Sequence, residues 1–433
     1  YPRPPQKLAP QYHELAGWTQ AAPGDALPKG AWWQAFHEPL LDRLEPLVAQ
    51  ANPTVAASYA NYQQALAEIR VARSALFPTL GLTGSGTRAR SGSGSSTSNT
   101  VNLLNSRRRV NSSASLEGQL NWEPDFWGKL RRGVDQNKAL ADADRATLAN
   151  TLLTEQVALA TAVIGLRISD ANIALLRTTV DNDRRYLEVI EHQDQAGTVQ
   201  PSDVITARTQ LEAAQASLVA AGMARARYEH AIAVLVGREP GALDLPATGT
   251  LPVLPDVPVG VPSTLLQRRP DIATAERQMA AQNEAIGIAI AAYYPSISLS
   301  AIDGFSQSPL SGLLHLANYV WSAGTSASET LFDGGLRRGH VVAARAAYDQ
   351  TAATYRGVVL SALQNVEDDL SNLRILGQQA EILEANVSDA RRGAEIAFNE
   401  YQAGTVDYTT VATAQTTRLA SEQSALAVRE NRL

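Results

Sequence analysis

The feature that most constrains the fold is a long stretch without proline, which runs from Lys129 to Gln195. Glycine occurs in it only at Gly133 and Gly165. Apolar residues recur there at every seventh position: Leu159, Leu166, Ile173, Val180 and Leu187. This spacing is typical of a coiled-coil seam. A helix over the whole stretch would be about 100 Å long, which no compact globular domain holds. We therefore predict an elongated, mainly helical protein.

The sequence also repeats itself with an offset of about 210 residues. Three landmarks recur in the same order: a residue–proline pair at Asn52-Pro53 and Arg269-Pro270, a Phe-x-Gly-x-Leu-Arg-Arg-Gly motif at Phe126–Gly133 and Phe332–Gly339, and Ala-Gly-Thr-Val at Ala196–Val199 and Ala403–Val406. An ordered set of matches predicts two similar structural halves.

We expect four segments along the chain. Residues 1–52 form an N-terminal tether and first connecting segment, 53–240 the first repeat, 241–268 a connection, and 269–433 the second repeat. Each repeat should contain a helix, two strands, a very long helix and a shorter helix. The first repeat has strands at about 79–88 and 110–123 and helices over 129–195 and 201–237. The second has strands at about 296–306 and 318–331 and helices over 336–402 and 407–433.

The predicted strands alternate between apolar and polar residues. From Val110 to Trp122 the even positions are largely apolar and the odd positions polar, over a length near that of a membrane-spanning strand. The polar positions are mostly Ser, Thr, Asn and Gln, as expected for a wet lumen. Aromatic residues such as Trp122, Tyr319 and Trp321 fall near strand ends, where a membrane interface favours them. A half-buried soluble sheet gives the same alternation, so the pattern alone leaves both structures open.

No run of 18 or more apolar residues occurs, so any membrane crossing is expected to use strands. Four strands cannot close a barrel, because the smallest membrane barrels need about eight. Open sheet edges are not tolerated in lipid. If the strands cross a bilayer, several chains must therefore combine theirs.

Composition and motifs argue against other classes of protein. A formal net charge of −6 disfavours a nucleic-acid partner. The chain contains 0 cysteines, which excludes disulfides and thiol chemistry. The 6 histidines are scattered without metal-ligand spacing, and neither a nucleophile elbow nor a phosphate-binding loop occurs. We expect no enzyme activity, no cofactor and no metal. The first residue is Tyr1 and not Met, from which we expect a removed leader.

Several blocks resemble the hallmarks of TolC-like outer-membrane efflux proteins, in particular the branch that serves tripartite RND-type pumps. The resemblance runs from about Trp32 to Leu433. The blocks are Trp32–Phe36, Ala51–Pro53, Trp122–Gly128, Leu235–Gly241, Val261–Ile272 and Leu331–Gly335. Each block is weakly specific by itself, whereas the ordered set is strongly specific.

The resemblance implies a homotrimer in which each protomer gives four strands to a twelve-stranded membrane β-barrel, continued by a long α-helical barrel. Such a trimer is a passive exit duct for drugs or other small toxic compounds. Its partners are a periplasmic adaptor, an inner-membrane RND-type transporter and outer-membrane lipid, in a Gram-negative bacterium, with the helical part in the periplasm. A lipid anchor upstream of Tyr1 is a further expectation. The alternatives are a type I secretion exit duct and a soluble periplasmic coiled-coil structural or adaptor protein.

The resemblance also assigns residues at the far end of the long helices. Gly197, Thr198, Gly404 and Thr405 lie in the two helix-hairpin turns, which in this family form the periplasmic tip and meet the adaptor. The structural alternative is a pair of ordinary helix turns, since glycine readily adopts the left-handed conformation that ends a helix.

Gate residues are expected close to these turns. Asp203 and Tyr401 match family positions that link neighbouring helix pairs in the closed state. Val406 stands where the family often has a basic residue. Thr410 and Thr413 stand where it often has an acidic ring, which leaves Asp407 or Asp203 as the source of negative charge. Both aspartates also suit an ordinary role as helix N-caps.

Overall fold

The computed structural model describes residues 30–90, 110–255, 269–307 and 312–433. The chain folds into two compact units, each built from separate segments of the sequence. The first contains Tyr62–Asp144 and Thr274–Tyr355, and the second contains the described parts of Pro5–Asn61, Arg145–Ala273 and Arg356–Leu433. Each unit thus combines segments from both predicted repeats.

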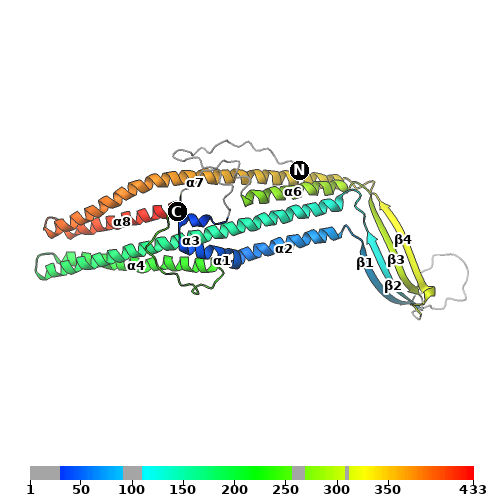
Figure 1. The fold of residues 1–433 in the computed structure, drawn as a ribbon, viewed down its shortest axis with the longest axis horizontal. Helices are drawn as coiled ribbons and strands as arrows, with labels where there is room; N and C mark the ends of the chain where they lie inside the picture. Colours follow the sequence, from blue (N-terminus) through cyan, green and yellow to red (C-terminus); the bar gives the residue numbers. More distant parts are fainter. Residues whose placement is uncertain (1–29, 91–109, 256–268, 308–311) are drawn as a thin grey trace. The chain divides into compact units, whose positions relative to one another are not determined.

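The first unit is built around one antiparallel sheet in the order β1-β2-β3-β4 (Figure 1). Its strands are β1 (Thr79–Arg90), β2 (Val110–Trp122), β3 (Ser296–Gln307) and β4 (Tyr319–Ser328). The unit also contains most of α6 (Pro270–Ala291), most of α2 (Pro53–Ser74) and the first parts of α3 (Lys129–Gln195) and α7 (Leu336–Gln402). The central β2–β3 pairing joins strands from the two predicted repeats.

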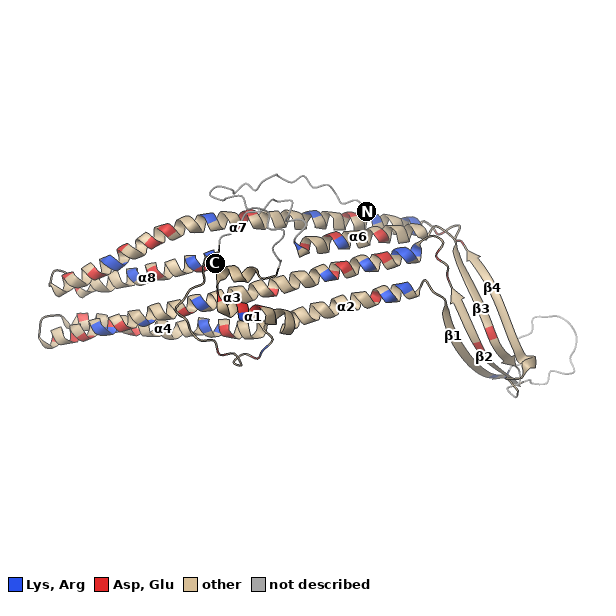
Figure 2. Ribbon diagram, in the orientation of Figure 1, with Lys and Arg blue, Asp and Glu red and all other residues tan. Residues whose placement is uncertain are grey.

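Strand register brings the apolar positions of all four strands onto one face. Leu120 of β2 pairs with Leu80 of β1 and with Ala301 of β3, and Ala301 pairs with Ala323 of β4. The same face carries Asp303, whose carboxylate accepts a hydrogen bond from the Tyr319 hydroxyl on the neighbouring strand. Figure 2 shows that the strands carry few charged residues compared with the helices.

Two tryptophans connect strand ends to the adjoining helical segments of the first unit. The Trp122 indole N–H donates to the Leu76 carbonyl at 3.0 Å. The Trp127 indole N–H donates to the Pro295 carbonyl at 2.7 Å, and its ring stacks on Tyr294 with 4.9 Å between centroids. These bonds satisfy polar groups where the chain leaves the sheet, which explains why the sequence has tryptophan at both corners.

The second unit contains the two long helix hairpins and a small N-terminal helical segment. The hairpins are the rest of α3 with α4 (Pro201–Leu235) and the rest of α7 with α8 (Tyr408–Arg432). The N-terminal segment is the 3₁₀ helix η1 (Trp32–Phe36) followed by α1 (Pro39–Ala51). Observed helix and strand ends lie within a few residues of the predicted ones; α4, for example, ends at Leu235 and not at 237.

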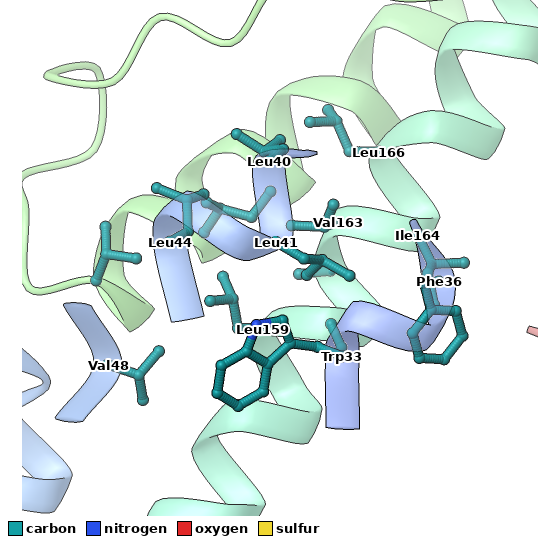
Figure 3. Packing of buried hydrophobic residues seen from close by; sticks show 14 of the residues in the cluster. Trp33, Phe36, Leu40, Leu41, Leu44, Val48, Leu159, Val163, Ile164 and Leu166 are labelled. Carbon is teal, nitrogen blue, oxygen red and sulfur yellow. The ribbon is translucent and has the colours of Figure 1, made fainter. Parts of the chain in front are cut away.

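The core of the second unit forms where η1 and α1 pack on α3 (Figure 3). Leu159 and Leu166, two positions of the predicted seam, are 0% exposed, and Val180 is 5% exposed. Full burial of each leucine contributes about 1.5–3 kcal/mol. Ile173 and Leu187, the other two positions of the predicted seam, are half-buried, so the seven-residue spacing marks the side of α3 that packs against the rest of the unit.

A charged network is buried beside this core. Arg167 of α3 donates to Glu38, the N-cap residue of α1, at 3.0 Å and to Asp170 at 3.4 Å. Arg225 of α4 donates to the other oxygen of Asp170 at 2.7 Å. The Thr248 amide donates to Asp170 at 3.3 Å, so the network joins four separate segments of the chain.

One window of α3 is long and apolar enough to cross a membrane by composition, although the sequence contains no uninterrupted apolar run of that length. Of this window, 67% is buried inside the protein. Its apolar residues therefore serve helix packing in the second unit, as those of a buried core helix do.

Candidate functional site

Both helix hairpins turn through the same local structure. Gly197 between α3 and α4 has φ of 70°, and Gly404 between α7 and α8 has φ of 73°. In each case the next residue, Thr198 or Thr405, donates its backbone N–H five residues back, at 2.9 Å and 3.0 Å. This pattern is the Schellman motif, which requires the left-handed conformation that glycine adopts without strain. All four turn residues, Gly197, Thr198, Gly404 and Thr405, are exposed.

Next to these turns, the ends of both hairpins share one buried apolar cluster, which we name the tip cluster. It contains Ile190, Ala207, Tyr401, Tyr408, Val411 and Ala412. These residues come from α3, α4, α7 and α8, so one small core holds all four helices together. Tyr408 is 1% exposed and its ring meets that of Tyr401 edge to face at 5.6 Å.

Two hydrogen bonds cross between the hairpins at this level. The Tyr401 hydroxyl of α7 donates to Gln193 Oε1 of α3 at 2.9 Å. The Gln415 amide of α8 donates to the Tyr186 hydroxyl of α3 at 3.0 Å. Sequence reasoning identified Tyr401 but missed the other three residues, because each is an ordinary helix residue whose partner is remote in sequence.

The expected partnership of Asp203 with Tyr401 takes a different form. Tyr401 bonds to Gln193, while burial and then the charge of Asp203 raise the pKa of Tyr401. Asp203 lies half-buried in the first turn of α4, whose N-cap is Gln200. A carboxylate there is stabilised by the helix dipole without acting as a cap. The two residues therefore interact through charge, and the predicted cap role of Asp203 is wrong.

The remaining gate candidates lie at the start of α8. Asp407 is its N-cap residue, as the cap interpretation predicted, but its side chain makes no cap hydrogen bond. Thr410 and Thr413 are exposed, and the Thr413 hydroxyl donates to the Thr409 carbonyl at 2.8 Å. Val406 is half-buried and packs against the tip cluster, so an apolar residue suits this position.

A buried carboxylate that the sequence did not single out lies in α3 near the tip cluster. Asp183 is 2% exposed, and its Oδ2 has no hydrogen-bond partner among the described residues. Burial raises the pKa of Asp183 to about 6. The Tyr408 pKa is raised by burial and then by the charge of Asp183. A buried carboxylate with a raised pKa therefore lies beside the contacts that join the hairpins.

Within the parts of the chain that the structure describes, no three His, Cys, Asp or Glu side chains are grouped to hold a metal ion. The side chains at the tip cluster instead form packing contacts and neutral hydrogen bonds. Such an arrangement can hold the hairpins together or release them, and it contains no nucleophile paired with a base.

Comparison with known proteins gives consistent matches over most of the chain. The sequence model of the outer membrane efflux protein family matches residues 46–238 and 261–433, two segments that overlap the two predicted repeats. The chain is 30% identical to the solvent efflux pump outer membrane protein SrpC of Pseudomonas putida, over 93% of this chain and 84% of that protein.

Solved structures agree with this match. The outer-membrane channel OprN has a TM-score of 0.87 and 26% identity, with 100% of this chain and 96% of that chain covered. The Campylobacter jejuni CmeC outer membrane channel has a TM-score of 0.90 at 20% identity, with 100% and 92% covered, which supports the fold alone. These matches confirm an outer-membrane channel of an efflux system and exclude the soluble coiled-coil alternative. The chain belongs to the outer membrane efflux protein family.

Proposed function

We propose that the protein is the passive exit duct of a tripartite efflux pump and works as a homotrimer with a twelve-stranded barrel. The observation that carries this proposal is the four-stranded sheet, in which β1 and β4 each pair on one side only. An unpaired edge in lipid leaves backbone donors and acceptors unsatisfied at several kcal/mol each. Pairing of β4 with β1 of a neighbouring copy satisfies both edges and closes the barrel.

The apolar face of the sheet supports the same proposal. Leu80 is 80% exposed, Leu82 77% and Trp321 71%. Apolar side chains exposed to this extent on one continuous face indicate a non-aqueous surrounding. Contact with outer-membrane lipid removes this surface from water.

The opposite face suits a water-filled lumen. Its hydroxyl groups bond across strands, as Ser85 does with Ser115 at 2.9 Å and Ser298 with Ser326 at 2.8 Å. Such a surface conducts solutes without a dedicated binding site. Because a relative is named a solvent efflux protein, we infer that small toxic organic compounds are among the cargo. The energy for transport then comes from the inner-membrane RND-type transporter, to which a periplasmic adaptor connects the duct.

The membrane orientation of the sheet can be tested with two adjacent lysine substitutions. Leu82→Lys places a charge on the proposed lipid face, and Thr83→Lys places it on the proposed lumen face. A lysine facing lipid costs about 2–4 kcal/mol near the bilayer centre. We expect only Leu82→Lys to reduce the yield of trimer in outer-membrane extracts, measured by native mass spectrometry. Equal yields for both variants, or a monomeric wild-type protein, would contradict the proposal.

We further propose that the tip cluster and its two inter-hairpin hydrogen bonds keep the periplasmic entrance closed. Tyr401→Phe removes the bond to Gln193, and Asp203→Ala removes the nearby charge. The double variant should raise single-channel conductance in planar bilayers, because each protomer loses contacts specific to the closed state. Tyr348→Phe, on α7 in the first unit, is the matched control and should conduct like wild type. Unchanged conductance of the double variant would remove Tyr401 and Asp203 from the gate.

The exposed turns are the proposed adaptor contacts. Thr198→Arg and Thr405→Arg add bulk at the tip without disturbing the φ-positive glycines beside them. We expect normal trimers and normal bilayer conductance but loss of efflux-dependent resistance in cells. Full resistance in both variants would place adaptor contact elsewhere.

A further inference from the structure

A cavity of about 540 Å³ lies within the second unit, and none of its lining residues belongs to the tip cluster. Residues of α3, α7 and α8 line it together with Leu251 and Leu254, which precede the second repeat. This volume falls within the range of about 300–1,000 Å³ that is typical of small-molecule sites. The cavity is therefore large enough for one organic ligand.

Most of the lining is aliphatic. The apolar lining residues are Ala171, Leu175, Leu251, Leu254, Ala380, Leu383, Val387, Ala425 and Leu426. Among the described residues that line the cavity, none has an aromatic ring and none carries a hydroxyl or an amide in its side chain. The apolar part thus favours a hydrocarbon body over a polar one, since transfer of apolar surface from water is favourable.

The charged lining residues are three arginines and two glutamates. Glu422 is 6% exposed and already accepts from Arg391 at 2.5 Å and from Arg418, outside the lining, at 3.5 Å. The remaining charged lining residues are two cations, Arg429 and Arg432, and one anion, Glu384, which is exposed on α7. The lining therefore has an excess of positive charge at the end of α8.

Neither of these two arginines is paired with a carboxylate in the described structure. One Arg429 nitrogen lies 3.4 Å from the Pro252 carbonyl, a long hydrogen bond. The Nε of Arg432 is buried without a hydrogen-bond partner among the described residues. A buried donor without a partner destabilises the fold, and more so when it belongs to a charged group. An anion bound at this end of the cavity supplies the missing acceptor.

We propose that this cavity binds an amphipathic organic anion. Its carboxylate, sulfonate or phosphate group bonds to Arg429 and Arg432, and its hydrocarbon body lies among Leu175, Leu254 and Leu383. Guanidinium groups match such anions because they donate two parallel hydrogen bonds. A bound ligand touches α3 as well as α7 and α8, so it stabilises the packing of the two hairpins by mass action. The proposal depends on the second unit alone and not on the trimer or the gate.

The test uses the full chain in nanodiscs of zwitterionic phosphatidylcholine. A hexadecanoate that carries a photoreactive diazirine is the probe, and mass spectrometry locates the labelled peptides. We expect label on peptides of α7 and α8 that line the cavity, with competition by dodecanoate at least tenfold stronger than by dodecanol. Equal competition by the neutral alcohol, or label confined to the strands, would overturn the proposal.

Three variants and one control make the result specific. Arg429→Gln and Arg432→Gln should each weaken competition by dodecanoate about tenfold, because each removes one charged hydrogen bond. Ala425→Trp fills the cavity and should abolish labelling there. Arg392→Gln, an exposed neighbour outside the lining, should label like wild type. If Ala425→Trp does not fold, the two arginine variants test the site by themselves. Competition by dodecanoate as strong in both variants as in the wild-type protein would reject the site.

Discussion

Replacement of Arg167 by methionine tests whether the buried charged network holds the second unit together. The Arg167 side chain is 5% exposed and bonds to Glu38 at 3.0 Å, to Asp170 at 3.4 Å and to the Pro246 carbonyl at 3.2 Å. Methionine matches the aliphatic stem of arginine and keeps its apolar packing, but it carries no charge and no hydrogen-bond donor. It leaves the carboxylate of Glu38, only 7% exposed, without its cation.

Loss of one partner from a buried ion pair costs about 3–5 kcal/mol, mainly because the other charge stays buried and unpaired. Asp170 retains Arg225 at 2.7 Å, so Glu38 carries most of this penalty. We therefore expect Arg167→Met to lower the free energy of unfolding by about 3 kcal/mol or more. Adding Glu38→Gln removes the orphan charge and should restore part of that loss.

Arg184→Met is the matched control on the same helix. Arg184 pairs with Asp181 at the same distance, 3.0 Å, but the two side chains are 52% and 61% exposed. An exposed pair of this kind contributes about 0.5 kcal/mol or less. Urea unfolding followed by far-ultraviolet circular dichroism measures all variants. The reasoning fails if Arg167→Met and Arg184→Met lose the same stability, or if Glu38→Gln makes Arg167→Met worse.

Three further predictions concern single residues. Asp183→Asn should stabilise the protein by up to about 3 kcal/mol at pH 8 and by little at pH 4. The reason is that the Asp183 pKa is raised from 3.8 to about 6, so the ionised carboxylate destabilises the folded state fully above pH 6 and not at all below pH 4. A stability gain that does not depend on pH would refute this explanation. Gly165→Ala should destabilise the protein by about 1–3 kcal/mol, because the new Cβ would lie 2.4 Å from the Tyr228 ring. Gly133→Ala should stabilise it by up to about 1 kcal/mol, because a Cβ there meets nothing within 4 Å and alanine favours the helix. Thermal unfolding of both variants checks that the two effects have opposite signs. Asn52→Ala should cost about 2 kcal/mol, because Asn52 Oδ1 caps α2 with bonds of 2.8 and 3.1 Å; an unchanged unfolding midpoint would exclude the cap.

The long helices were predictable because their signals are local. α3 begins at Lys129 and ends at Gln195, as predicted, between the flanking prolines Pro124 and Pro201. Gly197 ends it through the left-handed conformation that glycine favours. The strands were predictable for a similar reason, since alternation within each segment fixes its two faces. Their ends differ by up to three residues, as at Ser328 of β4, where no proline or glycine marks the boundary.

The contacts at the tip were only partly predictable. Family resemblance pointed to Tyr401 and Asp203, but the Tyr401 hydroxyl bonds to Gln193, which is 208 residues away in sequence. The Gln415–Tyr186 bond spans 229 residues. Neither glutamine stands out in its own helix, because glutamine is common on solvated helix faces. Helix rotation within the packed unit selects which side chains meet, and local periodicity leaves that rotation undetermined.

By itself the sequence determined the helices, the strands, the repeated plan and the glycine turns, because each follows from backbone preferences and side-chain spacing over a few neighbouring residues. Tertiary structure alone decided the partners of Arg167, the burial of Asp183 and the cavity beside Arg432. These features depend on the side chains that distant segments bring together. Burial then removes water, and the strength of every charge and hydrogen bond depends on whether water is present.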